Sequence, residues 1–173
     1  MTPQYLRPRL LETNDALDTF ECGSAEQTAW LQRHARQANA TGTAKVLVVT
    51  EIDSPEVIAY YAWAMANITV EDTPARMRKG AGRYPQPVAP LARLGVDLAH
   101  ERQGLGAALL KDAITRSAEL GATIGCRGLL VHAETDTARD FYLHLIPEFE
   151  HSPTDPLHLV LMMKDIHHTL RAG

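Results

Sequence analysis

One segment of the chain indicates much of its fold: Leu91-Ala-Arg-Leu-Gly-Val-Asp-Leu-Ala-His-Glu-Arg-Gln-Gly-Leu-Gly-Ala-Ala-Leu-Leu110. It has the pattern of a strand that ends near Asp97, a polar turn and the start of a long helix. Gly104 and Gly106 carry no Cβ, so ligand oxygens can approach the main chain there. The first N–H groups of the helix behind them have no intrahelical partner and lie at the positive end of the helix dipole. The segment therefore predicts an anion site for a phosphate or pyrophosphate group.

The kind of anion can be narrowed by elimination. A P-loop would need Gly-Lys-Ser/Thr at its end, and Gly104-Leu-Gly-Ala107 has no such lysine. A dinucleotide fingerprint would need a third Gly or Ala at the position of the bulky Leu109. With its flanks, Glu101-Arg-Gln-Gly-Leu-Gly-Ala107 resembles the acyl-CoA loop of the GNAT acetyltransferases, Gln/Arg-x-x-Gly-x-Gly/Ala between a strand and a helix. Glu101 departs from that pattern at a side-chain position, which leaves the main-chain donors intact.

The composition is that of one globular domain, which we expect to span residues 1–173. Of the 173 residues, 45% are hydrophobic and 22% charged, enough to bury a core. The net charge of −4 and a pI near 6.0 disfavour general coating of nucleic acid but allow a local basic patch. Cys22 and Cys126 are far apart and have no CxxC pattern, so neither a metal site nor a disulfide is expected, and the cytoplasm fits. No apolar run approaches the roughly 18 residues of a membrane span.

Periodicity and turn signals place the other elements. In the first half of the chain we expect a strand over 7–11, a helix capped by Ser24 and Gln27 that runs to about Asn39, and a hairpin of 45–51 and 57–65. A helix over 104–120, stopped by Gly121, and a strand over 127–133 should follow. The chain then continues with a short helix, capped by Thr135 or Asp136 and ended by Pro147, and a final strand over 157–163. The order strand, glycine turn, helix, strand predicts one right-handed parallel crossover unit. The pair His167-His168 is interpreted as tail rather than metal site.

The segment 73–90 is rich in proline and glycine and is expected to be a long loop without regular structure. The segment contains the cations Arg76, Arg78, Lys79 and Arg83, and Arg93 follows shortly after it. No Asp or Glu lies between Pro74 and Arg93. Such a run is either a docking place for an anionic partner or a solvated loop, and composition weighs the two equally.

The order of elements matches the GNAT fold over nearly the whole chain, and several details narrow the resemblance. These are Phe20-Glu-Cys-Gly-Ser24 before a Trp30-Leu31 helix, the basic proline-rich segment, Leu91–Asp97, and Asp140-Phe-Tyr-Leu-His144. Together they resemble the TacT/AtaT group of bacterial toxins, which acetylate the amino group of aminoacyl-tRNA and are neutralised by a ribbon-helix-helix antitoxin. The resemblance implies an α/β fold with a mostly antiparallel twisted sheet, one parallel crossover and helices on both faces. It also implies acetyl-CoA as donor, no metal, and a homodimer.

The resemblance also implies roles for particular residues. Tyr142 is the expected general acid, since a phenol of pKa near 10 can give a proton to a departing CoA thiolate of pKa roughly 8.5. A half-buried core tyrosine is the alternative. The residues expected to bind acetyl-CoA are Leu94, Gly95, Val96, Arg102, Gln103, Gly104, Leu105, Gly106 and Ala107. Those expected to bind tRNA are Arg36, Lys45, Arg76, Arg78, Lys79, Arg83 and Arg93.

Some alternatives stay open. Arg93 is either a core-edge charge paired with an acid or a contact to RNA, and His132 and Glu134 receive no firm role. The chain as a whole could instead acetylate a small amine or a protein N-terminus. A non-catalytic CoA-binding protein is the third possibility.

Overall fold

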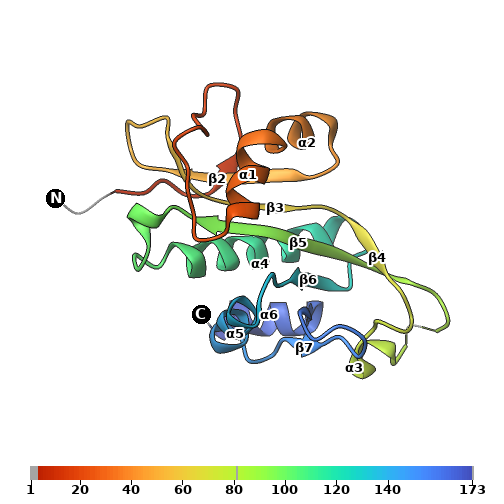
Figure 1. Cartoon of the computed structure of the whole chain (residues 1–173). Coiled ribbons are helices and arrows are strands. Elements are labelled where there is room, and N and C mark those ends of the chain that lie inside the picture. Colours follow the sequence, from red (N-terminus) through yellow and green to blue (C-terminus); the bar gives the residue numbers. More distant parts are fainter. Residues whose placement is uncertain (1–3, 81, 173) are drawn as a thin grey trace. The chain divides into compact units, whose positions relative to one another are not determined.

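The computed structural model describes residues 4–80 and 82–172. The chain divides into two compact units, one of Met1–Ala64 and Arg93–Asp112, the other of Met65–Ala92 and Ala113–Gly173. We call them unit 1 and unit 2 and describe each by itself (Figure 1). The expectation of a single domain over 1–173 stays a prediction.

Unit 1 contains two short helices and an antiparallel sheet. Its elements are β1 (Arg9–Leu10), α1 (Ala25–Arg33), α2 (Ala35–Thr41), β2 (Lys45–Thr50), β3 (Val57–Trp63), the end of β5 (Gln86–Val96) from Arg93 on, the 3-10 helix η1 (Leu98–His100) and the first turns of α4 (Leu105–Thr123). β2 pairs antiparallel with both β1 and β3, which confirms the predicted hairpin. Ser24 caps α1 by accepting a hydrogen bond from the backbone N of Gln27 at 3.1 Å, as predicted. The single helix expected up to Asn39 was wrong, because His34 leaves the helical conformation and separates α1 from α2.

The core of unit 1 forms between its helices and its strands. Phe20, Leu31, Val46, Val48 and Tyr60 have no exposed surface, and the rings of Phe20 and Tyr60 meet edge to face. Burying such side chains stabilises a fold by about 1.5–3 kcal/mol each. The two hairpin strands are almost continuously apolar and are buried along nearly their whole length, so they supply much of this core.

Unit 2 holds the parallel pair. Its elements are β4 (Ala66–Ile68), α3 (Ala75–Arg78), β5 up to Ala92, the remainder of α4, β6 (Gly128–His132), α5 (Asp136–Leu145), β7 (Glu150–His151), β8 (His158–Met162) and α6 (Met163–Ala172). β5 pairs with β6 in parallel, while β4 with β5, β6 with β8, and β7 with β8 are antiparallel. β5 contributes residues to both units. The strand order is β1-β2-β3-β5-β6-β8-β7, and β4 pairs with β5. The mixed α/β class and its one parallel crossover are confirmed.

The proline-rich segment is more regular than the sequence predicted. Within 73–90, α3 forms one helical turn and β5 begins at Gln86, running through Pro87 and Pro90. A proline removes one donor from a strand but keeps its carbonyl, and the carbonyl of Pro87 accepts a hydrogen bond from the backbone N of Arg127 at 2.7 Å. Ala81 lies outside the described residues.

Two further expectations need correction. α4 does not stop before Gly121 but continues to Thr123, and a Cβ on Gly121 would meet the end of the Met163 side chain. This glycine therefore makes room for a neighbour. The end of the chain is not a tail but the helix α6, which carries His167 and His168 and buries Ile166.

The described residues contain neither a metal-binding cluster nor a membrane-spanning helix. Over residues 4–80 and 82–172, no three His, Cys, Asp or Glu side chains are placed to hold a metal ion. Within those same ranges, no helix has both the length and the apolar character that crossing a membrane requires.

Two glycines of unit 2 provide a matched stability test. A Cβ on Gly128 would overlap the backbone carbonyl oxygen of Leu161, which cannot move without disturbing β8. Gly128→Ala should therefore lower the free energy of unfolding by about 2 kcal/mol or more, as overpacking does. Gly121→Ala meets only a flexible methionine and gains helix propensity of up to about 1 kcal/mol, so its stability should be equal or higher. Urea denaturation of both variants checks this, and equal losses would contradict it.

Candidate functional site

The predicted anion loop lies in unit 1, between η1 and α4. The carboxylate of Asp97 caps η1, accepting hydrogen bonds from the backbone N of Ala99 at 2.9 Å and of Glu21 at 3.0 Å. Arg102 and Gly104 then both have positive φ, +63° and +79°. Glycine adopts this conformation freely, whereas arginine does so at a cost of order 1–3 kcal/mol. The loop therefore follows a strained path that its surroundings must hold.

A cluster of His100, Tyr5 and Glu51 before the loop helps to fix its path. The Nδ1 of His100 lies 2.9 Å from the hydroxyl of Tyr5, and its Nε2 lies 3.4 Å from a carboxylate oxygen of Glu51. Burial and the Glu51 charge raise the pKa of the Tyr5 phenol. The cluster thus ties the start of the loop to the N-terminal segment and to the end of β2. The sequence alone does not indicate this cluster, because a lone histidine carries no periodic signal.

The helix that follows presents main-chain donors. Gly104 has no side chain to cap α4, and the first N–H groups of an α-helix, here from Leu105, Gly106 and Ala107, have no acceptor within the helix. Leu109 and Leu110 are fully buried and fix this end of α4 to the core. A phosphate group matches these donors and the helix dipole.

The strand before the loop has little space for side chains. A Cβ on Gly95 would lie 3.2 Å from a ring carbon of Tyr60 and 3.3 Å from the sulfur of Cys22, so glycine permits the close approach. Leu94 and Val96 on either side are half-buried.

Arg93 is engaged within unit 1. Its guanidinium donates to Glu26 at 2.9 Å and lies 5.5 Å from the ring centre of Trp30. This geometry favours the core-edge ion pair over the RNA contact.

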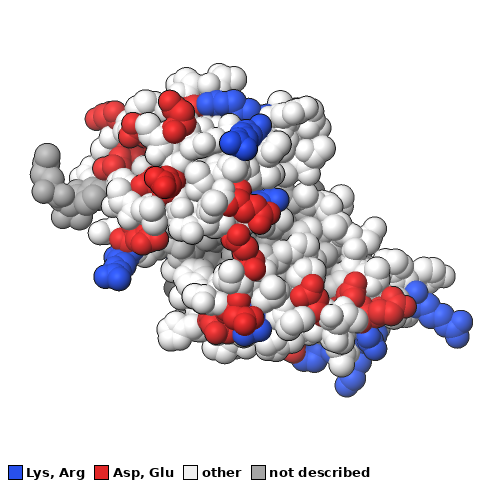
Figure 2. Space-filling model, in the orientation of Figure 1, with Lys and Arg blue, Asp and Glu red and all other residues white. Residues whose placement is uncertain are grey.

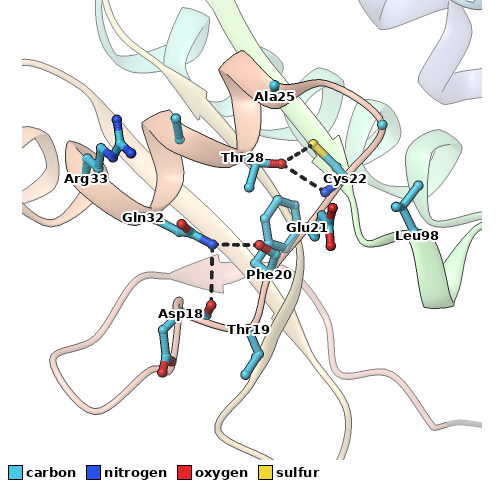
Figure 3. A pocket seen from close by; sticks show the side chains of 12 residues that line it. Asp18, Thr19, Phe20, Glu21, Cys22, Ala25, Thr28, Gln32, Arg33 and Leu98 are labelled. Carbon is cyan, nitrogen blue, oxygen red and sulfur yellow. Dashed lines mark hydrogen bonds between the residues drawn. The ribbon is translucent and has the colours of Figure 1, made fainter.

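A cavity of about 580 Å³ lies beside α1 (Figure 3). Gln32 donates to the carbonyl oxygens of Phe20 and Asp18 there, and the backbone N of Cys22 donates to the hydroxyl of Thr28. Its lining includes Asp18 and Glu21 as well as Arg33. The two carboxylates make it a poor match for a phosphate backbone. No motif in the sequence indicated this cavity.

Tyr142 lies in unit 2, on α5, which Thr135 caps through the backbone N of Ala138 at 3.1 Å. It is 6% exposed, its ring contacts those of Phe141 and Phe149, and its hydroxyl makes no hydrogen bond to any described residue. Burial raises the pKa of this phenol. Tyr142 is therefore protonated at neutral pH and can donate a proton but not accept one.

His132 stands at the end of β6, opposite His158 on β8. Their rings stack with centres 4.1 Å apart, and burial together with the neighbouring His158 lowers the pKa of His132. Asp155 lies 3.3 Å from the Nε2 of His158. The pairing gives His132 a structural partner within the sheet, where the sequence suggested no role.

The basic segment of unit 2 carries less unpaired positive charge than its sequence alone indicates. Arg76 donates to Glu150 at 2.7 Å and to Asp165 at 2.9 Å, and both acids lie far away in the chain. Arg78 donates to the backbone carbonyls of Thr73 and Glu71. Figure 2 accordingly shows blue and red side chains together around α3.

Lys79 and Arg83 make no hydrogen bond or ion pair with any other residue that the structure describes. They are therefore available to an external partner.

The last two predicted tRNA contacts lie in unit 1. Arg36 donates to the carbonyl oxygens of Glu12, Thr13 and Asp15, and Lys45 donates to that of Asn39 at 3.1 Å. Both cations hold loops in place by donating to backbone carbonyls, and the charge of Arg36 also interacts with the carboxylate of Asp15.

Comparisons with known proteins agree with the fold. Residues 13–145 match the acetyltransferase (GNAT) family. A relative from Mycobacterium tuberculosis, named tRNA-acetylating toxin, is 38% identical over 93% of this chain and 94% of its own. A structure of AtaT complexed with acetyl-methionyl-tRNAfMet has a TM-score of 0.86 at 20% identity, covering 96% of this chain and 99% of that one. A tyrosine-to-phenylalanine variant of AtaT, bound to the C-terminus of the antitoxin AtaR and acetyl-CoA, has a TM-score of 0.81 at 20% identity, covering 97% and 99%.

Proposed function

Because the chain belongs to the acetyltransferase (GNAT) family, we propose that it transfers the acetyl group of acetyl-CoA to the α-amino group of aminoacyl-tRNA and so blocks translation. The observation that supports this most is the likeness to the M. tuberculosis tRNA-acetylating toxin, which extends over almost the whole of both chains. The anion loop of unit 1 supports the choice of a pyrophosphate-containing donor.

The acetyl-CoA site is proposed to use the loop and the strand before it. The backbone N–H groups at the start of α4 bind the pyrophosphate, and the main chain of β5 holds the pantetheine arm. The residues are Leu94, Gly95, Val96, Arg102, Gln103, Gly104, Leu105, Gly106 and Ala107. The acetyl-CoA bound to AtaT supports this choice of donor.

The reaction needs little help in deprotonating the amine. An α-amino group has a pKa of about 7.7–8.0, and esterification of the carboxylate lowers it further, so much of it is neutral near pH 7. The amine nitrogen attacks the thioester carbon, the C–S bond breaks, and the sulfur leaves as a thiolate that needs a proton. The nitrogen loses its own proton to water.

Tyr142 is proposed as the acid that supplies that proton. Its buried phenol stays protonated at neutral pH, which suits a donor. A tyrosine was chosen for replacement in the AtaT structure, which supports a functional tyrosine in proteins of this fold. The alternative role as a core tyrosine predicts a loss of stability rather than of turnover.

The tRNA is proposed to be held by cations of both units. Lys79 and Arg83 are the most available. Arg78 and Lys45 donate to backbone carbonyls, and Arg36 does so as well but also interacts with the carboxylate of Asp15. Arg76 and Arg93 complete the proposed set, although each is paired with acids that reduce its attraction for phosphate.

The proposal extends to the protein's partners, its oligomeric state and its location in the cell. We propose a ribbon-helix-helix antitoxin, a homodimer, a cytoplasmic location, and a single domain over residues 1–173. AtaT binding to the C-terminus of AtaR supports the antitoxin. The two free cysteines fit a reducing compartment.

The deciding experiment uses labelled acetyl-CoA. The purified chain is incubated with aminoacyl-tRNA, uncharged tRNA, small amines and peptides. Label on the amino acid of charged tRNA alone supports the proposal. Label on peptides or small amines instead would favour the alternative acetyltransferase, and binding of acetyl-CoA without any transfer would favour a non-catalytic protein.

The first prediction concerns Gly104. Space around it is open, with no atom within 4 Å of the position that a Cβ would occupy, so Gly104→Val should leave the protein folded. Its φ of +79° strains any other residue, and the branched side chain obstructs the approach of a phosphate. Calorimetry should show acetyl-CoA binding weakened by about tenfold or more, the equivalent of about 1.4 kcal/mol. The same loss is expected for Gly106→Val, and unchanged affinity in both would refute the loop assignment.

The second prediction concerns Tyr142. Tyr142→Phe keeps the buried ring and removes the proton, so acetyl-CoA affinity and stability should be nearly unchanged. Turnover should fall by roughly 10²-fold, the scale of a lost general acid. Pre-steady-state measurement of acetyl transfer checks this. Wild-type turnover in the variant would leave Tyr142 as a core residue.

The third prediction concerns Lys79 and Arg83. The double change Lys79→Gln, Arg83→Gln should flatten the slope of log affinity for tRNA against log salt by about two units, one for each phosphate contact. Acetyl-CoA affinity should not change. The matched control, Arg7→Gln with Arg33→Gln, alters net charge equally at exposed positions outside the proposed set. Equal effects of the two pairs would contradict a local site.

A further inference from the structure

Tyr84 is the most exposed of the large hydrophobic side chains in the described part of the chain, at 77%. It follows Arg83 in the segment between α3 and β5 (Figure 1). A single exposed apolar residue needs no explanation by itself. Here, however, the surrounding main chain and charges are arranged in a way that a solvated loop does not require.

The main chain at Tyr84 is fixed. Its carbonyl oxygen accepts a hydrogen bond from the Nε2 of Gln86 at 2.9 Å, and the Gln86 side chain is itself buried. Arg127 donates to the Oε1 of Gln86 and, at 3.2 Å, to the carbonyl oxygen of Met77. Arg127 and Gln86 thus link the end of α3 to the start of β5. The aromatic ring is presented to solvent from an anchored backbone, which lowers the entropy cost of binding.

The start of the segment is anchored as well. Arg76 on α3 is held by Glu150 and Asp165, and Met77 has no exposed surface. Between these anchors, Lys79 and Arg83 have no ion pair or hydrogen bond with other described residues. An exposed aromatic ring in the same segment as available cations is the combination with which proteins bind single-stranded nucleic acid: the ring stacks on a base and the cations neutralise the phosphates.

We propose that Tyr84 is a stacking platform for an unpaired nucleobase of the RNA, with Lys79 and Arg83 at the adjacent phosphates. This deepens the proposed function and rests on it for the identity of the RNA. The ligand is a single-stranded segment, because bases within a duplex are already stacked and do not offer a free face. The unpaired 3′ end of a tRNA has this chemistry.

Three variants test the ring. Affinity for uncharged tRNA, measured by fluorescence anisotropy, should fall about tenfold in Tyr84→Leu and stay within about twofold of wild type in Tyr84→Phe, since stacking needs the ring and not the hydroxyl. Ile52→Ala is the control, because it removes an exposed apolar side chain, 50% exposed, from the turn between β2 and β3. It should leave the affinity unchanged. Affinity for acetyl-CoA should be the same in all variants.

Salt dependence separates stacking from charge. Tyr84→Leu should shift the plot of log affinity against log salt downwards without changing its slope, whereas Lys79→Gln with Arg83→Gln flattens it. A tRNA with 2-aminopurine in its unpaired 3′ end should show fluorescence quenching with the wild type and Tyr84→Phe. With Tyr84→Leu this quenching should be lost at saturating protein.

Several results would overturn the platform. Equal tRNA affinity of Tyr84→Leu and wild type would do so, as would a loss in Tyr84→Phe equal to that in Tyr84→Leu. Weaker binding of a protein partner with unchanged RNA binding would assign Tyr84 to a protein interface. Failure of the proposed function can be distinguished from failure of the platform. In that case the wild type would bind tRNA in a Tyr84-dependent way but transfer no label to aminoacyl-tRNA.

Discussion

The parallel pairing of β5 with β6 is the constraint from which the rest of the architecture follows. Two parallel strands cannot be joined by a tight turn, so the chain needs a crossover between them. Here the crossover is α4, and the loop that starts it follows directly on β5 and η1. The anion loop is therefore a product of the topology: a helix N-terminus with unpaired donors must follow the end of this strand. The backbone then needs glycine at Gly104, where φ is positive.

The sequence predicted best what depends on neighbouring residues. The hairpin of β2 and β3, the cap of Ser24 on α1 and the cap of Thr135 on α5 all have signals within a few positions of one another. The glycine loop also has a local signal, and its role in binding an anion stays a prediction. The GNAT resemblance then supplied the global order of strands, which local periodicity alone does not determine.

The sequence predicted worst what depends on distant partners. Gly121 has the sequence signal of a helix end, yet α4 continues past it and it lies against Met163, which comes many residues later. Pro87 and Pro90 argued against a strand, but pairing with β4 and β6 outweighs the donors they lack. The acid-free run around Arg76 looked uniformly positive because the acids that pair with it, Glu150 and Asp165, come from β7 and α6. A local charge count cannot include partners that only folding supplies.

The buried phenol of Tyr142 shows how environment limits chemistry more tightly than residue type does. In water, a phenol of pKa near 10 would be a better acid toward a thiolate than one whose pKa has been raised by burial. Proton transfer, however, depends on the difference between donor and acceptor in the same surroundings. A thiolate formed in an apolar site is destabilised by the same loss of solvation, so its pKa rises too. Burial therefore keeps the phenol of Tyr142 protonated at neutral pH, which is the form that its proposed role as an acid requires.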